Sequence, residues 1–62
     1  MEAQELLERS RRLLNSMHGE DREEAIALHE TIEAALASGD SEALAQASRE
    51  LKELLFFVEG RG

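Results

Sequence analysis

Few side chains in this chain could support catalysis or bind a metal. They are the two histidines, His18 and His29, and two serines at core-facing helical spacing, Ser10 and Ser48. A nucleophilic serine needs a base within hydrogen-bond reach, and neither serine has a histidine at a spacing that predicts one. The chain has no cysteine that could complete a metal site with the histidines. The sequence therefore predicts no catalytic residue, no metal site and no cofactor.

Structural roles account for the same four side chains. His29 lies near the middle of an apolar stripe, which predicts a helix-interface residue with one ring nitrogen hydrogen-bonded and the other at the edge. His18 suits the end of a first helix, where positive charge is favoured. Small serines let helices approach closely, or bond back to a carbonyl one turn earlier. The glutamates are expected to form a solvated face, because catalytic carboxyl pairs need an apolar pocket.

The charge balance narrows the range of partners. Fourteen acidic and seven basic residues give a net charge of -7, which disfavours nucleic acid and anionic membranes as partners. The pair Arg11-Arg12 is too small to form a nucleic-acid patch. No apolar run approaches the roughly 20 residues that cross a bilayer, and the acidic N-terminus lacks the apolar segment of a signal peptide. We therefore expect a cytoplasmic protein with protein partners.

Glycines divide the chain, which has no proline. Gly19 and Gly39 separate three segments, and each has the 3.6-residue apolar period of an amphipathic helix. The predicted helices cover about residues 2–18, 21–38 and 41–59. Short connections between amphipathic helices favour an all-α, antiparallel up-down-up three-helix bundle, with one domain over all 62 residues.

The predicted core is small, and we expect it to supply only a few kcal/mol of stability. A second subunit or a larger parent protein would stabilise such a bundle. The core positions are Ala3, Leu6, Leu7, Ser10, Leu13, Leu14 and Met17; Ala25, Leu28, Ile32, Ala35 and Leu36; and Leu44, Ala47, Ser48, Leu51, Leu54, Leu55 and Val58.

Capping residues mark the helix ends. Asp21 and Glu24 resemble a capping box that opens the second helix. Gly39 is suited to a left-handed C-terminal cap, and Asp40 or Ser41 to the N-cap of the third helix.

A run of five apolar residues at positions 54–58 breaks the one-sided pattern. At 100° per residue, Phe56 and Phe57 point about 140° and 120° away from Leu51, on opposite sides. We expect both phenylalanines to be largely exposed, as a docking surface for a second copy or for helices absent from this chain. The alternative is a frayed last turn whose phenylalanines fold back on the bundle.

Three stretches together resemble one protein family. Residues 5–14 (ELLERSRRLL) are similar to the second half of the long lid helix of DnaK-type, 70-kilodalton heat-shock chaperones. Residues 21–26 (DREEAI) look like the charged run that opens that family's next helix. Residues 37–44 (ASGDSEAL) resemble its Gly-Asp-acid, Ala-Ile turn, with Leu44 in place of the isoleucine. Their order and approximate spacing agree over about residues 4–55.

The resemblance implies the α-helical lid subdomain of a chaperone of the stress response. Such a lid closes over unfolded peptide held by a β-sandwich, so this chain alone would neither hydrolyse ATP nor hold a client in the usual groove. Its partner would be the rest of a chaperone chain. The other hypothesis is a free-standing helical interaction or dimerisation module that uses Phe56 and Phe57, with a homodimer as one form.

This chain departs from the family pattern at several positions. Bacterial members place an acid two residues before the Leu-Leu pair and a histidine just after it, forming a polar latch to the sandwich. Here those positions hold Gln4 and Glu8, so the latch is not expected. The loop around Gly19 is shorter than usual, and no final short helix or acidic tail follows Val58. These features suggest a divergent, shortened homologue trimmed to its last helices.

Overall fold

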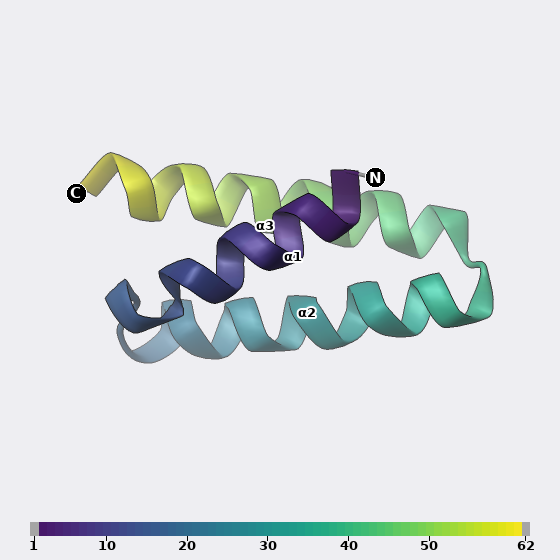
Figure 1. Cartoon of the computed structure of the whole chain (residues 1–62), viewed down its shortest axis with the longest axis horizontal. Helices are drawn as coiled ribbons and strands as arrows, with labels where there is room; N and C mark the ends of the chain where they lie inside the picture. The colour runs from purple at the N-terminus through teal and green to yellow at the C-terminus, as the bar shows by residue number, and fades with distance from the viewer. Residues whose placement is uncertain (1, 62) are drawn as a thin grey trace.

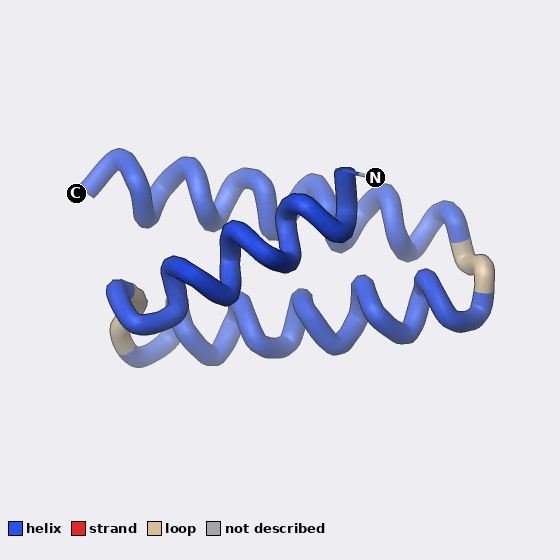
Figure 2. The backbone as a smooth tube through the Cα atoms, in the orientation of Figure 1, coloured by secondary structure: helices blue, strands red, loops and turns tan. Residues whose placement is uncertain are grey.

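The computed structural model describes residues 2–61, with side chains for residues 2–60, and its secondary structure is helical. It contains α1 (Glu2–Leu13), a short 3-10 helix η1 (Leu14–Ser16), α2 (Gly19–Ser38) and α3 (Ser41–Arg61). Loops are confined to two short connections (Figure 2). α2 and α3 form a long antiparallel hairpin, and α1 lies diagonally across it (Figure 1). The predicted all-α three-helix bundle is confirmed.

The first helix is shorter than predicted. Regular α-helix ends at Leu13 instead of residue 18, and η1 continues the chain to Ser16. Met17 is extended, with φ -91° and ψ 149°, and its side chain is buried. The weak helix formers Asn15 and Ser16 allow the backbone to unwind here, and the unwinding turns Met17 into the core.

The start of the second helix also differs from the prediction. α2 begins at Gly19, whose φ of +49° lies in the left-handed region that favours glycine. His18 is the N-cap, without a side-chain capping bond, so the predicted place of His18 at the end of the first helix is wrong. Asp21 lies inside α2, where its amide donates to the His18 carbonyl at 3.1 Å. The predicted capping box with Asp21 as N-cap is therefore wrong as well.

The turn between α2 and α3 has the predicted chemistry. Gly39 is left-handed, with φ 74° and ψ 23°. The amides of Gly39 and Asp40 both donate to the carbonyl of Ala35, at 2.9 and 3.0 Å, which closes the end of α2. The Asp40 carboxylate accepts from the Ala43 amide at 3.1 Å and so caps α3. These bonds hold the two long helices antiparallel.

The core runs along the contact between α2 and α3 and under α1. Its centre is formed by Ile32 and Leu51, both fully buried. Every predicted core position is buried or half-buried, and Leu13, Leu14, Leu36 and Leu44 are the half-buried members at its edges. The buried members are Ala3, Leu6, Leu7, Ser10, Met17, Ala25, Leu28, Ile32, Ala35, Ala47, Ser48, Leu51, Leu54, Leu55 and Val58.

Exposed ion pairs tie α1 to both arms of the hairpin. Lys52 of α3 binds Glu2 at 3.0 Å, and Glu59 of α3 binds Arg9. On the other side, Arg11 binds Glu33 of α2 at 2.8 Å. Each exposed pair contributes roughly 0–1 kcal/mol, so the pairs orient α1 more than they stabilise it.

A helix that spans a membrane needs roughly 20 consecutive, mostly apolar residues. Within residues 2–61, none of the helices is long and apolar enough to cross a bilayer.

Candidate functional site

The outer face of α3 carries two large exposed aromatic side chains. Phe56 is 80% exposed and Phe57 is 54% exposed, whereas Leu55 beside them is 1% exposed. The apolar run at residues 54–58 therefore divides into a buried part and an outward part, as predicted from the helical period. Two aromatic side chains in water are unfavourable for an isolated bundle and indicate a contact surface.

The same face continues toward the N-terminus of α3. We call the whole surface the α3 outer face, and all its residues are exposed. Its two charged members, Arg49 and Glu53, have no hydrogen bond or ion pair among residues 2–60, unlike the neighbouring Lys52. Its members are Ala45, Gln46, Arg49, Glu53, Phe56 and Phe57.

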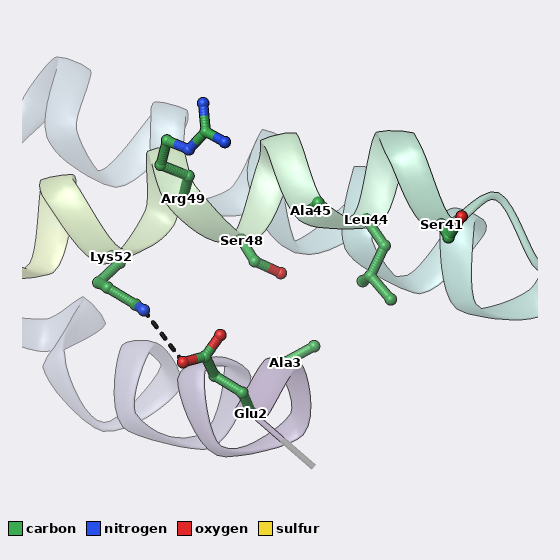
Figure 3. A pocket seen from close by; sticks show the side chains of 8 residues that line it. All are labelled: Glu2, Ala3, Ser41, Leu44, Ala45, Ser48, Arg49 and Lys52. Atoms are coloured by element: carbon green, nitrogen blue, oxygen red, sulfur yellow. Dashed lines mark hydrogen bonds and ion pairs between the residues drawn. The ribbon is translucent and has the colours of Figure 1, made fainter.

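A shallow groove borders this face where the N-terminus of α1 lies against α3. It encloses about 420 Å³. In Figure 3, Leu44 and Ser48 of α3 point toward α1, Ala3 of α1 lies across from them, and the Lys52–Glu2 ion pair spans one end. Arg49 points away from α1 in the same view, which places its guanidinium on the outer side of α3. The groove lining is Glu2, Ala3, Ser41, Leu44, Ala45, Ser48, Arg49 and Lys52.

Ser10 and His29 form a polar pair inside the bundle that the sequence reasoning missed. His29 Nε2 lies 2.6 Å from Ser10 Oγ. The two residues are 19 positions apart and meet only because α1 packs on α2. One signal could have found the pair: both are polar residues in the middle of apolar stripes, and buried polar groups need a partner. The prediction of His29 as an interface residue with a hydrogen-bonded ring nitrogen is confirmed.

The environment of this pair does not suit catalysis. Ser10 is 0% exposed and His29 is 7% exposed, so no substrate can reach the serine oxygen without opening the bundle. Burial, and to a lesser degree the charge of Arg11, lowers the pKa of His29 from its ordinary value of 6.5, while the Glu33 carboxylate opposes that shift. A neutral imidazole therefore fits the site, and Nε2 shares one hydrogen bond with the serine hydroxyl in a direction that depends on the ring tautomer.

The other two candidate residues from the sequence, Ser48 and His18, are not part of the Ser10–His29 pair. Ser48 lies in the floor of the groove, with no histidine among the groove residues. His18 is exposed at the start of α2. Among residues 2–61, no group of three His, Cys or acidic side chains is arranged to hold a metal ion.

Comparison of the chain with protein-family models, with curated proteins and with solved structures finds no match.

Proposed function

We propose that this chain is a non-catalytic protein-binding module that serves as the α-helical lid of a DnaK-like chaperone. The observation that carries the proposal is the distribution of the three resembling stretches over a single bundle. Residues 5–14 span most of α1, residues 21–26 lie in the first turns of α2, and residues 37–44 form the α2–α3 turn. A helical bundle is compatible with the α-helical lid that the resemblance implies. The module would act in the cytoplasm, as part of the response to heat shock and other stress.

The interior of the bundle supports a mechanical role. Ser10 and His29 are both buried, and their mutual hydrogen bond leaves neither side chain available to a substrate. The shared apolar core holds the three helices as one body, and the ion pairs of α1 with α2 and α3 orient α1. A stiff helical cap slows the escape of a bound peptide by closing over it, with no chemical step.

The experiment is a graft onto a chaperone that has lost its lid. Residues 2–61 replace the helical lid of a DnaK-type protein, and the dissociation rate of a fluorescent unfolded peptide is measured. We expect release to be slower than from the lidless protein. A matched control carries Leu51→Ala, which removes a fully buried side chain and should unfold the graft. Release at the lidless rate from a graft that is shown to be folded would overturn the lid proposal.

A second function is favoured by the exposure of Phe56, at 80%. In this alternative the chain is a free-standing interaction or dimerisation module, and Phe56 and Phe57 form its contact. The two functions differ in what the α3 outer face does: a lid needs this bundle close to a peptide-binding domain, whereas an interaction module needs only the exposed face. Binding measurements on the isolated chain therefore test the second function without the graft.

A further inference from the structure

We propose that the α3 outer face binds a second copy of this chain, with the two α3 helices antiparallel. The inference rests on the second of the two functions above and names its partner. It goes beyond the exposure of the phenylalanines, because the charges on the face determine both the partner and its orientation.

The six residues of the face lie in one narrow stripe. Taking the direction opposite the buried Leu51 as the midline, Arg49 and Glu53 lie about 20° from it. Phe56 and Phe57 lie about 40° and 60° to either side, toward the C-terminus. Ala45 and Gln46 flank the midline in the same way toward the N-terminus. All six are exposed, so a straight helix can contact the whole stripe, roughly 18 Å long.

A two-fold axis near the level of Leu51 makes this stripe complementary to itself. It places Arg49 opposite Glu53 of the second copy, and Glu53 opposite Arg49, so that two ion pairs form. Phe56 then covers Ala45 of the second copy, whose small side chain leaves room for the ring. Phe57 likewise lies against the aliphatic part of the Gln46 side chain of the second copy. The two phenylalanine contacts join residues on the same side of the midline, as an antiparallel pair requires, whereas Arg49 and Glu53 lie only about 20° from the midline, on opposite sides.

The parallel arrangement is disfavoured by the same residues. It would bring Arg49 against Arg49 and Glu53 against Glu53, and like charges in an interface cost affinity. In the antiparallel arrangement, Glu42 lies opposite Gly60 of the second copy, which has no side chain to oppose it. The charge order along α3 therefore selects one orientation.

The ion-pair pattern within the monomer leaves these two charges available. Lys52 and Glu59, on the side of α3 nearest α1, are engaged by Glu2 and Arg9. Arg49 and Glu53 make no such bond among residues 2–60. Pairing with a second copy satisfies the charges of both Arg49 and Glu53.

The overall negative charge is compatible with this contact. α2 holds six acids and one arginine, a net charge of -5, and so carries most of the excess. The α3 outer face has one cation and one anion and is neutral. At physiological ionic strength the Debye length is about 8 Å, so the acids on the far side of α2 are largely screened from the second copy. A neutral, partly aromatic face is where two such acidic chains can approach.

Sedimentation equilibrium on the isolated chain, from about 1 μM to about 1 mM, tests the proposal. We expect a monomer–dimer equilibrium for the natural sequence. Arg49→Glu or Glu53→Arg alone places like charges opposite each other and should weaken the dimer about tenfold or more. The double variant Arg49→Glu with Glu53→Arg exchanges the pair and should restore the dimer. The matched controls are Arg12→Glu and Glu30→Arg, which make the same charge changes at exposed positions of α1 and α2 and should leave the dimer unchanged.

The orientation has its own test, because the chain contains no natural cysteine. Gln46→Cys lies about 15 Å along the axis from its equivalent in the antiparallel dimer, so a 46–46 disulfide should not form while dimerisation persists. Three results would overturn the proposal. They are formation of a 46–46 disulfide, a monomer throughout the concentration range, and a charge exchange that fails to restore the dimer. Circular dichroism of each variant separates lost association from lost folding. If dimerisation fails while the graft still slows peptide release, this inference and the dimerisation form of the second function fall, and the lid proposal stands.

Discussion

The inner and outer faces of α3 come from one helix but have opposite surroundings. Leu51 and Leu55 on the inner face are at most 1% exposed, whereas Phe56, directly after Leu55, is 80% exposed. The inner face packs against α1 and α2, whereas the side chains of the outer face are exposed. Helical geometry alone separates the two, since neighbouring residues differ by about 100° around the axis. The comparison shows that apolar content does not distinguish core from contact surface, while position around the helix does.

The largest effect on stability should follow from removing an inner side chain. Leu51→Ala deletes a fully buried leucine and is expected to cost about 2–5 kcal/mol, which is comparable to the whole stability of so small a bundle. Urea denaturation followed by circular dichroism measures it. Phe56→Ala is the matched outer change and should alter stability by less than about 0.5 kcal/mol. Equal losses of unfolding free energy for Leu51→Ala and Phe56→Ala would contradict the distinction between the inner and outer faces.

The polar pair under α1 comes next in expected size. Ser10→Ala leaves His29 Nε2 buried without its 2.6 Å partner, and we expect a loss of about 1–3 kcal/mol in unfolding free energy. Ser48→Ala is the control, because Ser48 is similarly buried but has no histidine partner. Identical urea midpoints for the two variants would show that the Ser10–His29 bond contributes nothing.

The α2–α3 turn determines which face of α3 is turned inward, and Gly39 is its key residue. Gly39→Ala keeps free space around the new Cβ but forces alanine to a φ of +74°. That conformation costs roughly 1–2 kcal/mol, which a shift in the thermal midpoint would report. Gly60→Ala, at a helical glycine with equal space, should not destabilise the bundle. An unchanged thermal midpoint for Gly39→Ala would mean that the turn relaxes to another conformation.

A smaller effect should appear as a pH dependence. Because the pKa of His29 is lowered in the folded state, the unfolded chain binds more protons once the pH falls to about 6.5 and below. The contribution of His29 is therefore complete above that pH and declines as the pH falls through the lowered folded value. The difference in unfolding free energy between the natural chain and a His29→Gln variant, measured from pH 8 to pH 5, cancels the shared carboxyl titrations. A difference that is constant with pH would contradict the assignment.

Much of the bundle could be predicted from periodicity and turn chemistry. The apolar stripes, the left-handed Gly39 and the outward Phe56 all depend on short-range geometry, which a sequence contains. The early end of α1 could not be predicted from the sequence, because it depends on the burial of Met17, which is a tertiary contact. Ser10 and His29 were each assigned to the core, yet their pairing depends on how α1 crosses α2. Arg9 could likewise be expected to pair with Glu5 one turn away, but it reaches Glu59 on α3.

The most direct test of the contact surface combines folding and association in one variant. Replacing both Phe56 and Phe57 with serine changes only outward side chains of α3. Circular dichroism with urea should show a bundle as helical and nearly as stable as the natural chain, while sedimentation equilibrium should show the loss of association. A Phe56→Ser single variant separates the two positions. Loss of helical structure in the double variant, or association that survives it, would contradict the assignment of this face to binding.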